Sequence, residues 1–346
     1  MSPIHNDFAA PGVSPTPWLS ILVPVYNVGA YVDECVASIM RQWIDGVEVL
    51  MLDDASTDDS GTLIHALSLQ YPGRIRLLHH ARNRGLSAAR NSLLAQATGS
   101  HVWFLDSDDL LCAGALADLQ RILLAHDPDL VLCDFRMLRT RPGLKHCLRG
   151  EGHRHSFGGR RRRLLTDRHA LVAGLLVASQ LHAWSKIARR EVWLHAPFPE
   201  GRYFEDIAVI PDLLQAAESV YYEPTPWVAY RQRADSIVQT FSVQKVRDLL
   251  MSLEQLHADM QEKFPTMAPA AQFALDQFCL KGVTASARRA CRAGEARQPE
   301  LRAMYRASLV RMFPQGVEPV LDRYRRRGWI LRAARIGKTL RQNRII

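Results

Sequence analysis

The sequence lacks the features that define several common classes of protein. No stretch of its 346 residues approaches the ~20 uninterrupted apolar residues that a membrane-spanning helix requires. The six cysteines are scattered and form no CxxC pair, which argues against a disulfide framework or a zinc site and fits a reducing compartment. The N-terminus has no basic start followed by an apolar run, as a secretory signal would. We therefore expect a short disordered leader over 1–17 and a cytoplasmic protein.

The sequence also lacks the motifs of a histidine metal site and of a dinucleotide-binding site. The thirteen histidines show no HxxxH or HExxH spacing, so a histidine metal site is not expected. The first apolar run ends in PVYN (Pro24–Asn27) without the glycines of GxGxxG, which disfavours a dinucleotide site. The cluster at 153–155, with four arginines at 160–163, predicts a solvated loop. A patch for a phosphate or an acceptor is the alternative.

The formal net charge of +9 is concentrated at the C-terminus. Residues 323–346 hold eight Arg, one Lys and no acid, so they carry the whole +9 and residues 1–322 sum to zero. Within 319–344, four apolar residues fall on one helical face at i, i+4, i+7 and i+11: Trp329, Ala333, Ile336 and Leu340. Such a helix favours an anionic membrane surface, and a helix packed on the body with solvated arginines is the equal alternative. No nucleic acid partner is expected, because no stacking platform or binding motif accompanies the charge.

Apolar runs alternate with amphipathic stretches through the first 140 residues. The apolar runs predict strands at 19–25, 47–52, 75–78, 102–105 and 130–133. Helical periodicity between them predicts helices at 30–42, 58–70, 87–97 and 113–125. Short strands separated by helices of roughly a dozen residues indicate βαβ units. The sequence therefore predicts the α/β class with a mostly parallel sheet.

The pattern changes after residue 140. Residues 140–163 predict a loop or hairpin insertion, followed by helices at 167–177 and 206–217 and strands at 219–222 and 227–231. Helices then dominate, at 243–263, 268–292, 301–313 and 319–340. We place a boundary near 240, between a sheet-based domain at 18–240 and a helical C-terminal region at 241–346 that ends in the basic tail.

Three carboxylates follow the apolar run VWFL. Asp106, Asp108 and Asp109 repel one another at the end of a buried strand, where open α/β sheets bind their ligands. A hard divalent cation, Mg²⁺ or Mn²⁺, with diphosphate oxygens completing its octahedron, would neutralise them. Acids that cap the next helix and stay in water are the alternative.

Two more segments carry candidate ligand contacts. Asp54, after the second strand, can accept hydrogen bonds from the N–H groups of a base or from ribose hydroxyls, with an Asx turn and helix cap as the alternative. Gly85 and Ser87 predict the entry to a helix on which Arg90 projects one turn in, where it can meet a phosphate. A solvated or paired arginine is the alternative.

These motifs, in this order, resemble the family-2 glycosyltransferases. The matching run begins at PVYN, passes through DDASTD and NRGLSAARN, and reaches FLDSDD. It continues with a W-x-K block at 184–186, the Phe204-Glu205-Asp206 element, and Tyr230-Arg231 followed by Ser236-Ile237. The resemblance covers roughly residues 18–240. Ala55 stands where glycine is usual, and nothing after about 245 is diagnostic.

The resemblance implies the A-type glycosyltransferase fold, a Rossmann-like nucleotide-binding sheet. It implies metal-dependent transfer of a sugar, by single displacement with inversion, from a nucleotide-diphosphate donor to a hydroxyl of a glycan or lipid-linked acceptor. UDP-sugars are the commonest donors, Mn²⁺ or Mg²⁺ is the cofactor, and cell-surface polysaccharide synthesis at the inner face of the membrane is the expected setting. The alternatives are a catalytically inactive, membrane-associated nucleotide-binding protein and a nucleotidyltransferase on a similar sheet. The retained DSDD and ED motifs argue against an inactive binding protein. A nucleotidyltransferase would favour a loop rich in Gly and Lys or Arg after the first strand, which PVYN lacks.

The resemblance also implies a role for each matching residue. Together with Arg90, the expected nucleotide-sugar contacts are Pro24, Tyr26, Asn27, Asp54, Asp106, Arg231 and Arg233. Asp106 and Asp108 are the expected metal ligands, with Asp108 the direct one. Asp206 is the expected catalytic base, and Glu205 tunes its proton affinity or holds it in place. Trp184 and Lys186 are expected on the acceptor side, with a buried Trp and a surface Lys as the alternative.

Overall fold

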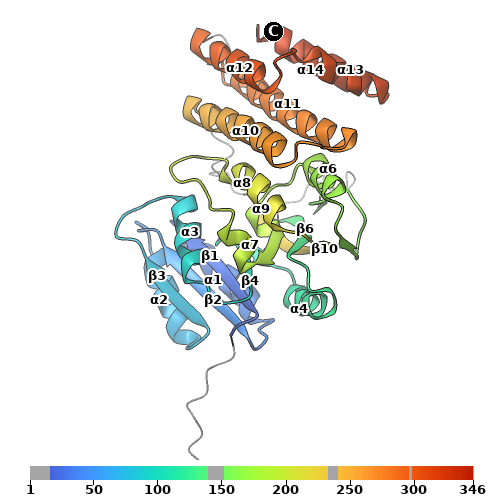
Figure 1. The fold of residues 1–346 in the computed structure, drawn as a ribbon. Helices are drawn as coiled ribbons and strands as arrows, with labels where there is room; N and C mark the ends of the chain where they lie inside the picture. The colour runs from blue at the N-terminus through green and yellow to red at the C-terminus, as the bar shows by residue number, and fades with distance from the viewer. Residues whose placement is uncertain (1–15, 139–151, 233–240, 296–297, 346) are drawn as a thin grey trace, which may run out of the picture.

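The structure, a computed structural model, describes residues 16–138, 152–232, 241–295 and 298–345. These residues form a ten-stranded sheet covered by helices, with a further layer of helices from the C-terminal region (Figure 1). This is the α/β architecture that the sequence predicts. Only the last two positions of the predicted leader are described. None of the described helices is long and apolar enough to cross a membrane.

Four parallel strands form the first half of the sheet, in the order β3-β2-β1-β4. Their bounds are Leu19–Val25 (β1), Val47–Asp53 (β2), Ile75–His79 (β3) and His101–Phe104 (β4). The crossover helices are Val32–Met40 (α1), Ser60–Gln70 (α2) and Leu86–Gln96 (α3). Every residue of β1 is buried, because helices cover both faces of this central strand. The parallel register places Val25 opposite Asp53, so β1 and β2 end side by side.

The second half of the sheet is mixed. It continues as β4-β9-β6-β10-β5, with β9 antiparallel to both β4 and β6, and β10 parallel to β6. The bounds are Leu110–Leu111 (β5), Leu130–Leu138 (β6), His153–Arg154 (β7), Leu164–Leu165 (β8), Lys186–Arg189 (β9) and Val220–Arg231 (β10). The sequence analysis predicts no strand at β9, because four residues are too few to show a period.

The strands predicted at 219–222 and 227–231 are one strand, β10. Its register against β6 shifts between Glu223 and Pro226 and again between Pro226 and Val228. Proline has no backbone N–H to donate, so the ladder is interrupted there without ending the strand.

Helices cover both faces of the sheet and create two buried clusters. The helices of this region not yet given are Ala115–His126 (α4), Arg168–Ala178 (α6), Arg190–Leu194 (α7), Glu205–Ala208 (α8) and Ile210–Ala216 (α9). Side chains from α1, α2 and α4 pack in one cluster, and those from α3, α6, α7 and α9 in the other. The single helix predicted at 206–217 is therefore two, α8 and α9, which meet at Val209.

The C-terminal helices extend the second cluster. Their bounds are Val243–Lys263 (α10), Pro269–Arg292 (α11), Pro299–Met312 (α12), Glu318–Arg326 (α13) and Ile330–Gln342 (α14). They lie over α6, α8 and α9, on one side of the sheet (Figure 1). The predicted boundary near 240 falls at 233–240, outside the described residues.

The basic tail packs on the body, which the sequence analysis gives as the equal alternative to an anionic membrane surface. The helix expected over 319–340 is broken at Gly328, which has φ of 75°. Trp329 packs against the core, and the rest of the apolar stripe is buried in it: Ala333, Ile336 and Leu340. The stripe therefore covers α11 and the body instead of facing a membrane. Basic side chains such as Arg332 and Lys338 remain exposed.

Two leucines on α14 test this packing. Leu340 is fully buried, so Leu340→Ala is expected to lower the free energy of unfolding by about 2–5 kcal/mol. Leu331 is 80% exposed, and Leu331→Ala is expected to change it by less than about 0.5 kcal/mol. Urea unfolding followed by circular dichroism measures both. Equally small effects would contradict the packing of α14 on the body.

Candidate active site

The turns after β1 and β2 form one wall of the candidate site, beyond the carboxyl ends of parallel strands. The backbone N–H of Asn27 donates to Ser56 Oγ (3.1 Å), and Asn27 Oδ1 accepts from the backbone N–H of Thr57 (2.8 Å). Tyr26 is 46% exposed beside them, whereas Pro24 is buried within β1. Of the nucleoside contacts predicted on this turn, Tyr26 and Asn27 are therefore the accessible ones.

Asp54 has a different role from the predicted one. Its Oδ1 accepts from the backbone N–H of Arg84 (2.9 Å) and lies 2.6 Å from His80 Nδ1, and its Oδ2 accepts from the backbone N–H of Gly85 (2.8 Å). The residue is only 2% exposed. A buried carboxylate needs donors, and the turn before α3 supplies them. Asp54 therefore holds that turn in place instead of presenting free oxygens to a base.

Arg90 is the centre of the site. Its side chain is 1% exposed, and Nη1 donates to Glu205 Oε1 and to Asp206 Oδ1, both at 2.9 Å. Nη2 donates to Asp106 Oδ1 at 3.1 Å. The carboxylates come from the turn after β4 and from the first turn of α8. Arg90 thus joins three carboxylates from two distant segments, which is the paired arginine that the sequence analysis gives as the alternative to a phosphate contact.

This cluster has more negative than positive charge. Burial by itself lowers the pKa of Arg90, but the carboxylates of Asp206, Asp106 and Glu205 outweigh it and raise that pKa. Burial, followed by the charge of Asp206, raises the pKa of Glu205 to about 7 despite the neighbouring Arg90. Glu205 therefore keeps its proton at pH values where an exposed glutamate is ionised. The side chains of Asp106 and Asp206 remain 27% and 20% exposed, so solvent reaches this edge of the cluster.

Arg231 braces the acidic turn from the side of β10. Its backbone N–H donates to Asp109 Oδ1 (2.7 Å), and its Nε donates to the carbonyl oxygen of Asp108 (2.9 Å). Its Nη2 donates to Glu34 Oε2 (2.6 Å). The guanidinium predicted to reach a diphosphate is thus engaged within the protein. Arg233, predicted to act beside it, lies outside the described residues.

The turn at 106–109 fits a divalent cation. Asp109 is fully buried, and its Oδ2 has no hydrogen-bond partner within the described part of the chain. Burial and the charges of Asp106 and Asp108 raise the pKa of Asp109 well above its ordinary value. Three carboxyl groups are thus crowded into one turn, and one of their buried oxygens has no hydrogen-bond partner among the described residues. Its donors are carboxylate oxygens, the ligands that Mg²⁺ and Mn²⁺ prefer.

The W-x-K block is buried. Trp184 is 1% exposed and stacks with His182 (ring centroids 4.6 Å apart) and with Tyr230 (5.5 Å). Lys186 is fully buried, its Nζ donates to the carbonyl oxygen of His182 (2.8 Å), and burial lowers its pKa to about 8. The surface Lys given as an alternative is therefore wrong, and the two residues can act on an acceptor only through the residues that they support.

Some residues of the site are missed by the sequence analysis. His182 belongs to the aromatic cluster with Trp184 and Tyr230, and Glu34 on α1 anchors Arg231. His182 lies two residues before the W-x-K block, which is the one signal that points to it. Glu34 has none, because its partner lies on β10, far along the chain.

Comparison with known proteins identifies the fold and the family. Residues 20–172 match the model of Glycosyl transferase family 2. Through this region, the chain belongs to glycosyl transferase family 2. The matched segment contains Asp54, Arg90 and the acidic turn at 106–109, and it ends before Glu205 and Asp206. The resemblance drawn from the sequence motifs is confirmed, and the chain is a glycosyltransferase.

Individual relatives extend the likeness beyond residue 172. Glycosyltransferase GlyG of Streptococcus pneumoniae serotype 4 is 26% identical in an alignment of 248 residues that covers 67% of this chain and 77% of GlyG. The crystal structure of S. aureus TarS 1-349 in complex with UDP-GlcNAc has a TM-score of 0.68 at 19% identity, over 94% of this chain and 91% of that one. The mannosyltransferase PcManGT from Pyrobaculum calidifontis, in complex with GDP-Man and Mn²⁺, has a TM-score of 0.51 at 18% identity, over 97% and 89%. These structures confirm the predicted fold class.

Glu205 makes the stability of the protein depend on pH. Its pKa is about 7 in the folded state against 4.5 for an ordinary glutamate. Between these values the folded state binds more protons than the unfolded one, so the free energy of unfolding falls as the pH rises, by at most about 3 kcal/mol. Below about pH 4.5 and above about pH 7, the contribution of Glu205 to the free energy of unfolding no longer changes with pH. Glu205→Gln is expected to reduce the fall by the share that Glu205 contributes, measured by urea unfolding at about pH 5 and about pH 8 without divalent cations.

The matched control is Glu262→Gln on α10, since Glu262 is exposed. That variant is expected to keep the pH dependence of the natural protein. If Glu205→Gln and Glu262→Gln show the same dependence, Glu205 does not titrate as described.

Proposed function

We propose that this glycosyltransferase moves a sugar from a nucleotide-diphosphate donor, a UDP-sugar, to a hydroxyl of a glycan or lipid-linked acceptor in cell-surface polysaccharide synthesis. One observation carries the proposal: Arg90 joins Asp106, in the acidic turn after β4, to Glu205 and Asp206 on α8. Carboxylates suited to a donor-side cation and carboxylates suited to a base thereby share one cluster. Sugar transfer needs both in one place, because the donor and the acceptor hydroxyl must meet in a defined orientation.

Asp206 is the proposed base. Its side chain is the more exposed of the pair, 20% against 12% for Glu205, and Arg90 fixes its direction through Oδ1. Burial and the charge of Asp206 raise the pKa of Glu205 to about 7, so below that pH Glu205 keeps its proton and adds no second negative charge beside the base.

The motif pattern offers one base and no second nucleophile among the described residues of the cluster, which supports a single displacement. The acceptor oxygen attacks the anomeric carbon as the bond to the diphosphate oxygen breaks, and the hydroxyl proton passes to Asp206. The nucleoside diphosphate leaves with the electron pair of the broken bond. Attack opposite the leaving group inverts the anomeric configuration.

Asp106 and Asp108 are the proposed ligands of a Mn²⁺ or Mg²⁺ ion. A bound cation of this kind neutralises the negative charge that develops on the leaving diphosphate. Arg90 holds Asp106 through Oδ1, and Arg231 holds the carbonyl oxygen of Asp108. Both residues therefore keep the turn in position to receive a cation. The Mn²⁺ in the complex of PcManGT supports this assignment.

Further observations support the proposed UDP-sugar donor and the proposed location at the membrane. The complex of TarS with UDP-GlcNAc supports a UDP-sugar as donor. Exposed basic side chains such as Arg332 and Lys338 on α14 support a cytoplasmic enzyme at the inner face of the membrane, where anionic lipid attracts them. The intact cluster around Arg90 argues against an inactive binding protein, because such a protein has no need of both acidic motifs.

Asp206→Asn tests the base. We expect kcat to fall by about 10²–10⁴-fold while donor binding is retained, because proton transfer is lost and the Arg90 contact can persist. Turnover with a UDP-sugar and an acceptor glycan is followed by proton NMR, which also reports the anomeric configuration of the product.

The control for this variant is Asp212→Asn on α9, whose carboxylate pairs with Lys263 (2.9 Å) outside the cluster. It is expected to leave kcat unchanged. Unchanged turnover in Asp206→Asn would remove Asp206 as the base. Retention of the anomeric configuration by the natural protein would overturn the single displacement.

Asp108→Ala tests the cation site. Isothermal titration calorimetry of UDP, GDP and dTDP is expected to show binding of one nucleotide that Mn²⁺ strengthens. In Asp108→Ala this strengthening is expected to drop by at least the roughly 10–100-fold that changes around metal ligands cause. The control is Asp118→Ala on α4, a half-buried residue outside the acidic turn that pairs with Arg121. Mn²⁺-dependent binding that survives in Asp108→Ala would contradict the assignment.

A further inference from the structure

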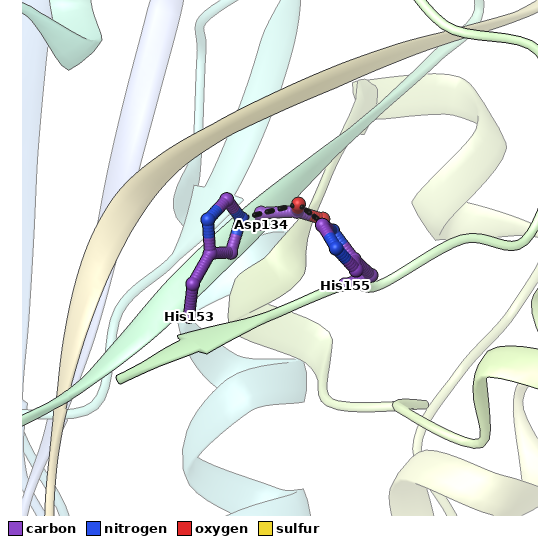
Figure 2. A group of neighbouring side chains, drawn as sticks. All are labelled: Asp134, His153 and His155. Carbon is purple, nitrogen blue, oxygen red and sulfur yellow. Dashed lines mark hydrogen bonds and ion pairs between the residues drawn. The ribbon is translucent and has the colours of Figure 1, made fainter. Parts of the chain in front are cut away.

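A second cluster of polar side chains surrounds Asp134, in the middle of β6. The strand is otherwise apolar around it, and Asp134 is fully buried. Its Oδ1 accepts from the backbone N–H of Ser156 and from the hydroxyl of Tyr222, both at 2.8 Å. Its Oδ2 lies 2.7 Å from His153 Nε2 and 2.7 Å from His155 Nδ1 (Figure 2). One oxygen is thus held by the fold, and two imidazoles converge on the other.

We propose that Asp134, His153 and His155 bind a transition-metal ion of the zinc class, separately from the hard-cation site at 106–109. One ligand atom from each residue lies within 4.8 Å of the other two. Two imidazole nitrogens and one carboxylate oxygen are a donor set that zinc takes readily. Mg²⁺ and Mn²⁺ prefer oxygen ligands alone, so the chemistry of the two sites differs.

Strand geometry explains why these histidines meet Asp134. Side chains two residues apart on a strand point to the same face, so His153 and His155 project together while Arg154 projects away. β7 pairs antiparallel with β6, with His153 opposite Arg136 and Arg154 opposite Phe135, which brings the next residue, His155, to Asp134. The sequence analysis excludes a histidine metal site because it searches for helical spacings. The spacing here is HxH, the period of a strand.

Three groups that can ligate a metal ion converge at one place in this cluster. The two imidazole rings lie 4.6 Å apart and share a single acceptor oxygen, although their side chains are 42% and 52% exposed and water could serve either ring. An ion among the three donors would accept a lone pair from each, which would account for the convergence of the two imidazole rings on one oxygen. Tyr222 and Ser156 hold the other oxygen of Asp134, which is the kind of outer contact that orients metal ligands.

Three protein ligands leave a fourth position for water. Structural zinc sites use four protein ligands, whereas sites that keep three leave one position open to a water or another small ligand. The half-exposed histidine rings place that position toward solvent. The ion would also fasten β7 to β6, whose next residue, Phe135, packs against Trp184 (ring centroids 4.7 Å apart). The proposed metal site is therefore adjacent along β6 to Phe135, which packs against the aromatic cluster. It includes no residue assigned to catalysis.

The test is zinc binding by the full-length chain, stripped of metal with a chelator and kept in excess Mg²⁺ to fill the hard-cation site. We expect one Zn²⁺ to bind per chain in elemental analysis after dialysis against micromolar Zn²⁺. Substituted Co²⁺ is expected to show the visible absorption of four-coordinate cobalt. The double variant His153→Gln/His155→Gln is expected to lose both signals. Because both side chains are half-exposed, we expect the variant to fold, and circular dichroism checks this.

Two further variants sharpen the result. His65→Gln changes an exposed histidine on α2 and is expected to bind as the natural protein does. Tyr222→Phe removes an outer contact and leaves all three ligands, so the affinity is expected to fall by roughly 10-fold or more. No zinc bound by the folded natural protein, or binding unchanged in the double variant, would overturn the proposal.

Discussion

The buried guanidinium of Arg90 is the interaction on which the rest of the site depends. A charged group without exposure is costly unless it is paired and hydrogen-bonded, and Arg90 is paired with three carboxylates at once. Removing one partner of a buried ion pair typically costs about 3–5 kcal/mol, because the other charge is left uncompensated. The same contacts that make the burial of Arg90 tolerable therefore hold the acidic turn after β4 and the first turn of α8 together. The contacts that stabilise the fold around Arg90 are therefore the same contacts that assemble the site.

The C-terminal helices take part in this arrangement by bracing the segment before α8. The backbone N–H of Tyr203 donates to Asp248 Oδ2 (3.2 Å) on α10, and the Lys245 ammonium of the same helix lies 5.4 Å from the centre of the Tyr203 ring. Phe204, with φ of 63°, then turns the chain so that Glu205 and Asp206 enter α8 facing Arg90. The layer of helices that carries no diagnostic motif thus positions the two acids that the family model does not reach. Its own burial against α6 makes it part of the core.

The sequence predicts the parts of the fold that depend on local pattern. Apolar runs locate β1, β2 and β4 within a residue or so, because a strand buried on both faces must be apolar almost throughout. The same pattern fails at β9, which is too short, and at the single helix expected over 319–340, where Gly328 allows a break that periodicity does not reveal. The apolar face of the basic tail illustrates a more general limit. An amphipathic stripe shows that a helix covers something apolar, and only the fold shows that α14 covers α11.

By itself the sequence determined the family and the α/β class, because the order of motifs and the period of apolar residues are properties of the chain alone. The tertiary structure decided what each residue does there. Asp54 became the anchor of a turn, Arg90 a partner of three carboxylates, and Arg231 a brace for the acidic turn, since hydrogen-bond partners come from segments far apart in the chain. It also decided that two histidines and Asp134 meet, because strand pairing sets which side chains face each other across a sheet.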